Sequence, residues 1–206
     1  SFEKVKHMKS YSDSVQWRYV GKADFLFGTG ATRVEKVLVF IGSSLGIFLY
    51  GYFFLTDALV WTWWQYGLAI LIAMDVFGGL VANSLNSCKR FYHTPPKDDE
   101  PSYTPILKNH FLFAIFHIYP LLASLLFGNG NFFYGVFWYI LLIVYGWIVI
   151  KTPLYLKRPV AFLTILISLL LNYYAIPVIP GFAWLAPALF IKILYGYLVP
   201  EEPYRP

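Results

Sequence analysis

Charged side chains are scarce in this chain: Asp, Glu, Lys and Arg make up 13% of its 206 residues, against roughly 25% in an ordinary soluble domain. Hydrophobic residues reach 58% and aromatic residues 21%. A soluble fold of this size cannot bury that much apolar surface, and a disordered chain requires the opposite composition. The composition therefore excludes both classes and indicates an integral membrane protein.

Cysteine is nearly absent as well. The one cysteine, Cys88, excludes an internal disulfide framework and every zinc motif built from several cysteines. The formal net charge is +5, which by itself suits an anionic partner such as a nucleic acid or a membrane surface. Because the cations lie between long apolar stretches, we expect membrane lipids as partners and no nucleic acid.

Four long stretches carry no charged residue, namely 37–56, 58–74, 109–150 and 159–191. A helix that crosses a bilayer needs about 20 apolar residues, so the stretch 109–150 holds two helices, and the stretch from 159 to 200 also holds two. Turn residues at 128–131 divide one of them, and Pro177, Pro180 and Gly181 divide the other. The sequence thus predicts an all-α bundle with six transmembrane helices at 34–56, 58–86, 107–127, 132–150, 159–177 and 181–199.

The lysines and arginines predict the orientation of this bundle. With the N-terminus in the cytoplasm, all of them except Lys192 fall in segments on the cytoplasmic side. This distribution follows the positive-inside rule and predicts that both termini are cytoplasmic. We expect residues 1–33 to form a cytoplasmic or interfacial arm, 34–199 the membrane domain and 200–206 a cytoplasmic tail. The tight connection at Thr56-Asp57 is predicted to join the first two helices, one of these residues capping the second helix.

A few ionisable residues lie inside the predicted helices: Asp75, His110, His117 and Lys192. Such groups are costly in hydrocarbon and usually face the interior of a bundle for a purpose. At about 1.5 Å per residue, Asp75, His117 and Lys192 lie roughly 10–15 Å from the cytoplasmic ends of their helices. We therefore predict a shared polar site in the cytoplasmic half, with Asp75 facing His117.

Helical phase extends this site along the second helix. At 100° per residue, Gly79, Asn83 and Asn86 share the face of Asp75 and are candidate substrate contacts. His93 would share that face too if the helix continued beyond the membrane. His110 and His117 are two turns apart and lie on one face of the third helix.

One hypothesis is a membrane-embedded, metal-assisted hydrolase. Asp75, His110 and His117 would hold a divalent metal such as zinc, with His93 as a further candidate ligand. Metal-bound water would attack a lipid ester or amide, and Lys192 would stabilise the developing negative charge. Asp75, His117 and Lys192 are then the candidate catalytic residues. No established metalloenzyme spacing such as H-E-x-x-H occurs in the chain.

Two alternatives stay open. Asp75, His117 and Lys192 could form a proton relay or ion site of a small transporter or channel, for which six helices suggest a homo-oligomer. The chain could also be a structural scaffold, in which Asp75 only bonds a neighbouring helix and Lys192 extends to the headgroups.

Overall fold

The computed structural model describes residues 24–97 and 100–200, in which helices and short connections make up the chain and no strand occurs. Most of the expected N-terminal arm and C-terminal tail lies outside these residues. Within them, five helical segments are long and apolar enough to cross a membrane. They are α1 (Arg33–Leu55), α2 (Trp63–Ser84), the segment His110–Phe127, α7 (Phe132–Lys151) and α8 (Leu154–Tyr174). The all-helical fold is confirmed for the described residues, in which five helices are apolar and long enough to span a membrane, one fewer than the six predicted.

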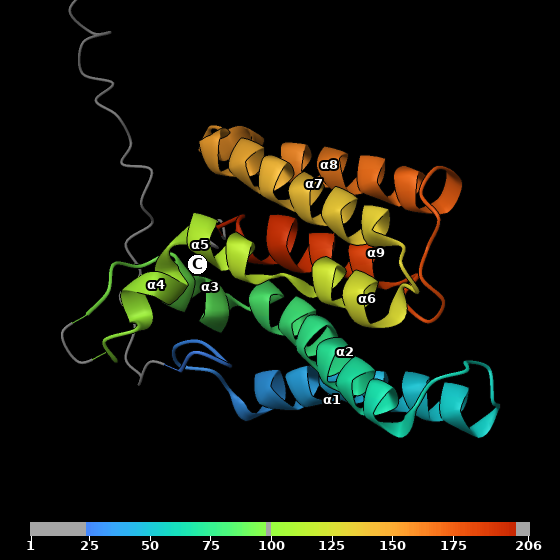
Figure 1. The fold of residues 1–206 in the computed structure, drawn as a ribbon. Coiled ribbons are helices and arrows are strands. Elements are labelled where there is room, and N and C mark those ends of the chain that lie inside the picture. The colour runs from blue at the N-terminus through green and yellow to red at the C-terminus, as the bar shows by residue number, and fades with distance from the viewer. Residues whose placement is uncertain (1–23, 98–99, 201–206) are drawn as a thin grey trace, which may run out of the picture.

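The segment predicted as a sixth span is shorter than expected and forms the centre of the fold. It consists of α9 (Leu185–Phe190), which continues into a π-helix, η2 (Ile191–Tyr197). In Figure 1, α7 and α8 lie on one side of α9, and α1 and α2 lie on the other. Leu185, Leu189 and Ile193 have no exposed surface. This helix is therefore covered by its neighbours over most of its length.

Small residues let α1 and α2 pack closely. A Cβ added at Gly46 of α1 would lie 2.8 Å from the Cβ of Ala73 in α2, closer than two such atoms can approach. Small residues at helix contacts are a common packing device in membranes.

The start of α1 is set by Thr32. Its hydroxyl accepts a hydrogen bond from the backbone amide of Glu35, and the Glu35 carboxylate accepts one from the backbone amide of Thr32.

The connection between α1 and α2 is longer than predicted. It covers residues 56–62, and α2 begins at Trp63 after Thr62, whose amide donates to the Gln65 side chain at 2.9 Å. The expectation that Thr56 or Asp57 caps the second helix is therefore wrong. Asp57 instead has a positive φ of 49° within the turn. By contrast, the predicted turn at 128–131 is confirmed, since Asn129 and Gly130 both have positive φ.

Two predicted helices are interrupted. The third is divided into α4 (Thr104–Lys108), α5 (His110–Phe116) and α6 (Tyr119–Phe127). Asn109 separates α4 from α5 and caps α5, and Pro120 accounts for the break before α6, because it has no N–H to donate to the turn before it. The second ends at Ser84, after which Leu85 is extended and α3 (Asn86–Tyr92) begins. A continuous helix to His93 is therefore not formed.

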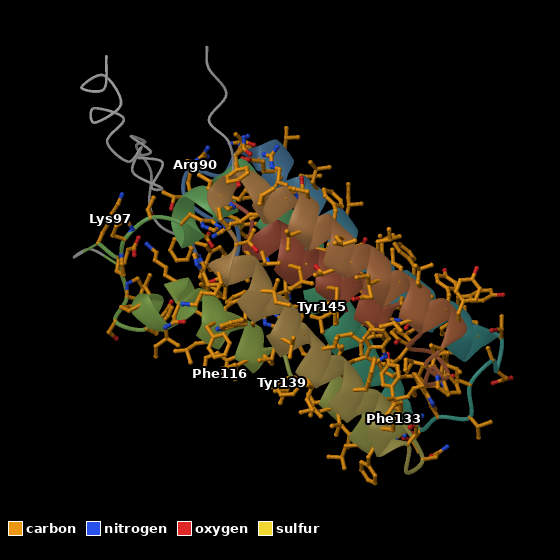
Figure 2. The ribbon with its side chains drawn as sticks, turned by 90° about the horizontal axis from the view of Figure 1, so that it is seen from above. Arg90, Lys97, Phe116, Phe133, Tyr139 and Tyr145 are labelled. Carbon is orange, nitrogen blue, oxygen red and sulfur yellow. The ribbon has the colours of Figure 1, made fainter. Side chains whose placement is uncertain are left out.

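Both ends of the described chain meet at α3. The Thr29 amide donates to the Ser87 carbonyl at 2.9 Å, and Tyr92 donates to the Phe25 carbonyl at 3.0 Å. From the other end of the chain, the Val199 carbonyl accepts from Lys89. Figure 2 shows Arg90 and Lys97 at this end of the bundle and Phe133 at the opposite end. We call the end with α3 the cationic end.

The opposite end is filled by an aromatic cluster, which we define as Tyr50, Trp61, Phe127, Phe182 and Trp184. The rings of Trp61 and Phe127 have centroids 4.7 Å apart, and those of Phe127 and Phe182 are 4.8 Å apart. Tyr50 donates to the Gly181 carbonyl at 3.0 Å. The cluster thereby ties α1 to the connection between α8 and α9.

Candidate functional site

An ion pair between α2 and η2 is the centre of the candidate site. The ammonium of Lys192 lies 2.5 Å from Oδ2 of Asp75 and also donates to the Asp75 carbonyl at 3.2 Å. The Lys192 side chain is 4% exposed, whereas the Asp75 side chain is 48% exposed. The pair therefore has a buried positive member and an accessible negative member.

Gly79 makes this contact sterically feasible. A Cβ at position 79 would collide with the stem of Lys192, and it would lie 2.7 Å from Nζ. One turn further along α2, the Asn83 amide approaches the Lys192 carbonyl at 3.4 Å. Two of the predicted substrate contacts thus lie beside Lys192: Gly79 leaves room for the Lys192 side chain, and Asn83 bonds to its backbone carbonyl.

The interruption between α5 and α6 brings two further side chains to the pair. Tyr119 donates to Oδ2 of Asp75 at 2.8 Å. His117 is buried, and its Nδ1 donates to the Phe113 carbonyl at 2.7 Å, which orients the ring. Because the backbone leaves the helix at His117, these neighbouring positions can both turn toward α2.

The ion pair lines a cavity of about 380 Å³. Its walls come from α1, α2, α5 and residues 25–27, and its polar lining includes Ser43, Asp75, Asn83, His117 and Lys192. The other walls are largely aromatic: Phe25, Phe27, Phe40, Tyr92, Phe113, Phe116 and Tyr119. Its volume is within the range of small-molecule sites, about 300–1,000 Å³. The arrangement is an apolar chamber with one accessible carboxylate.

The other two predicted ligands lie together in a different place. The rings of His93 and His110 have centroids 4.7 Å apart, and His93 Nε2 donates to the Tyr197 carbonyl at 2.8 Å. Burial, followed by the neighbouring His110, lowers the pKa of His93 to about 3. The Nε2 atom of His110 is buried and has no hydrogen-bond partner among the described residues.

The structure thus separates the predicted metal ligands into two groups. Asp75 and His117 line the cavity, whereas His110 pairs with His93. Within residues 24–97 and 100–200, no three His, Cys, Asp or Glu side chains are grouped so that they could hold a metal ion. The zinc site stays a prediction from the sequence. Asn86, at the start of α3, does not belong to the cavity lining.

Tyr119 is the site residue that the sequence reasoning missed. The available signal was Pro120, since a proline inside an otherwise apolar span predicts an interruption and therefore a change in the direction of the adjacent side chains. The aromatic walls were missed as well, because many phenylalanines in a membrane chain simply face lipid.

Comparisons with protein-family models, with curated protein sequences and with solved structures find no match to this chain.

Proposed function

We propose that this protein is a small proton- or ion-coupled membrane transporter and that Asp75 and Lys192 form its coupling site. The observation that carries the proposal is the ion pair beside an accessible cavity inside an apolar helical bundle. Ionisable groups in such bundles are costly and mark the paths of ions and substrates. Asp75, accessible and bonded to Tyr119, is the group that exchanges a proton or ion.

The irregular helices next to the pair support this proposal. Lys192 belongs to the π-helix η2, and His117 lies at the interruption between α5 and α6. Segments of this kind are frequent at functional sites, and interrupted helices border the binding sites of many transporters. Each provides a place where the backbone can rearrange during a transport cycle.

A second cavity on the other side of the aromatic cluster is also consistent with transport. It has a volume of about 310 Å³ and is lined by Trp61, Gln65, Phe127 and Asn129, among others. The ring of Trp184 packs on Phe77 of α2, with centroids 4.5 Å apart. We propose that the aromatic cluster closes the path between the two cavities in this state.

The proposal includes six crossings with both termini in the cytoplasm. An even number of crossings is supported by the contacts of residues 25–29 and of Val199 with α3, which place both ends of the described chain together. The cationic end would then face the cytoplasm, as the positive-inside rule requires. Cysteines introduced at Asn129 and Lys97 should be labelled from the outside and the inside, respectively.

The transporter is favoured over the hydrolase by the bonding of the carboxylate. Oδ2 of Asp75 is already bonded to Lys192 and Tyr119. A carboxylate that is paired with an ammonium and exposed in an accessible cavity suits charge exchange. A purely structural pair would have no need of the adjoining cavity.

Proton flux into vesicles tests the proposal. Purified protein is reconstituted into liposomes that contain a pH-sensitive dye, and a potassium diffusion potential, negative inside, is applied. We expect acidification faster than in protein-free vesicles and its loss in Asp75→Asn. The matched control is Glu100→Gln, which removes the carboxylate of a second ion pair, Lys108–Glu100 at 2.7 Å, outside the spans. Equal flux in wild type and Asp75→Asn, or no flux beyond empty vesicles, would contradict the proposal.

A further inference from the structure

We propose that the cavity beside Asp75 binds a monovalent, hydrophobic organic cation, which is the substrate class of the transporter proposed above. The inference rests on that proposed function and adds the chemistry of the ligand. It is carried by the free side of the carboxylate, the aromatic walls and the depth of the site.

The charge that the cavity offers to a ligand is negative. The Asp75 side chain is 48% exposed, whereas that of Lys192 is 4% exposed and is already paired with Asp75. Both side-chain bonds that the described residues make to this carboxylate end on Oδ2. Oδ1 is therefore the oxygen available to a cation or to a hydrogen-bond donor that enters the cavity.

The walls suit a cation with apolar substituents. Seven of the lining residues are Phe or Tyr, and one of them, Tyr119, donates to the Asp75 carboxylate. The faces of aromatic rings attract cations and at the same time exclude water from apolar groups. The ammonium of Lys192 already lies 5.9 Å from the centre of the Tyr119 ring, which shows that a cation is accommodated at this wall. An anion would meet the same rings and the exposed carboxylate, both of which disfavour it.

The depth of Asp75 favours a diffusible cation over a lipid headgroup. Asp75 is nine residues from the end of α2 at Ser84, or about 13 Å at 1.5 Å per residue. The amine of a phospholipid lies at the membrane surface and would have to be drawn that far into the hydrocarbon. A freely diffusing hydrophobic cation can enter the cavity without displacing a headgroup.

Three probes of similar shape and different charge test this inference. Tetraphenylphosphonium is the cation, tetraphenylborate the anion and triphenylphosphine oxide the neutral compound. Binding to the full chain in phosphatidylcholine nanodiscs is measured by equilibrium dialysis against empty nanodiscs. We expect saturable, one-to-one binding of the cation only. Saturable binding of the anion or of the neutral compound with equal affinity would overturn the proposal.

Variants of the ion pair should change cation affinity in opposite directions. Asp75→Asn removes the counter-charge and should weaken binding at least about 30-fold. Lys192→Met removes the competing ammonium and leaves the carboxylate, so the affinity should rise. Unchanged affinity in both variants would refute a site at Asp75. If Asp75→Asn does not fold, the rise in Lys192→Met alone decides, since a nonspecific apolar site would not respond to the loss of a cation.

The aromatic wall provides a matched control. Phe116, which lines the cavity, and Phe133, at the other end of the bundle, are both 60% exposed (Figure 2). Phe116→Ala should weaken tetraphenylphosphonium binding about fivefold, and Phe133→Ala should leave it unchanged. Equal effects of the two substitutions would contradict binding in this cavity.

Two further measurements distinguish a diffusible cation from a lipid headgroup, and the cation-binding site from the proposed transporter. The affinity for tetraphenylphosphonium should be the same in nanodiscs that contain phosphatidylethanolamine. A lower affinity in these nanodiscs would show that the lipid amine competes for the site and would overturn the proposal that the ligand is a diffusible cation. Proton flux without cation binding would refute the substrate class and leave the transporter standing. Cation binding that depends on Asp75, without any flux, would refute the transporter and leave the binding site standing.

Discussion

The two ends of the bundle are built from different chemistry. At the end opposite α3, the aromatic cluster fills the space between helices, and the Trp184 indole donates to the hydroxyl of Tyr50 at 3.2 Å. Toward the cationic end, the helices are interrupted, a cavity of about 380 Å³ remains open and the ion pair of Asp75 and Lys192 lies at its wall. Close packing leaves little freedom to move, whereas interrupted helices beside a cavity allow rearrangement. The aromatic end therefore holds the helices together in this structure, whereas the other end holds the candidate site.

The ion pair provides the strongest test of this comparison. Asp75→Ala would leave the ammonium of Lys192 buried without a counter-charge and should lower the free energy of unfolding by about 3–5 kcal/mol. Lys192→Met should cost less, because the Asp75 side chain is 48% exposed and can be solvated in the cavity. The double substitution should regain most of the loss. Denaturant titration of the four proteins measures these differences. Equal losses in the two single variants, or an additive double variant, would show that the pair does not behave as one unit.

The aromatic cluster should affect stability and leave ligand binding alone. Phe182 has no exposed surface and packs on Trp61 and Phe127. Phe182→Ala should lower the free energy of unfolding by about 3 kcal/mol because it creates a cavity. The affinity for tetraphenylphosphonium should not change. Phe133→Ala, at an exposed ring, is the control and should have little effect on unfolding. A large loss of cation affinity in Phe182→Ala would remove the proposed division between the two ends.

The smallest of these effects concerns pH and is confined to the cationic end. Burial and the neighbouring His110 lower the pKa of His93 from 6.5 to about 3. Between these values the unfolded chain binds a proton that the folded chain does not, so stability is lost as the pH falls below 6.5. The contribution of His93 should reach about 2 kcal/mol between pH 6.5 and pH 5. His93→Gln should lose stability less steeply over this range, whereas above pH 7.5 the two profiles should run parallel. Parallel profiles down to pH 5 would show that His93 does not titrate in this way.

The breaks between helices were predictable where residues with special backbone preferences occur. Gly130 and the prolines at 177 and 180 located two turns correctly, because these residues favour turns in any context. Pro120 carried the same information but was not used, and the interruption beside His117 was missed. The break at Leu85 had no comparable signal, since leucine is a good helix former. It depends on the contacts of α3 with residues 25–29 and Val199, which are distant in the sequence.

The sequence by itself determined the all-helical, apolar character of the protein and the positions of most apolar helices, because apolar length can be counted along a chain. Only the tertiary structure decided that Lys192 meets Asp75, that Tyr119 bonds to the same carboxylate and that His110 pairs with His93. The physical reason is that these helices are apolar on nearly every face. A soluble helix shows by its polar face how it is rotated, whereas a membrane helix of this kind does not. Rotation is set by packing between helices, and packing determines which polar groups share a site.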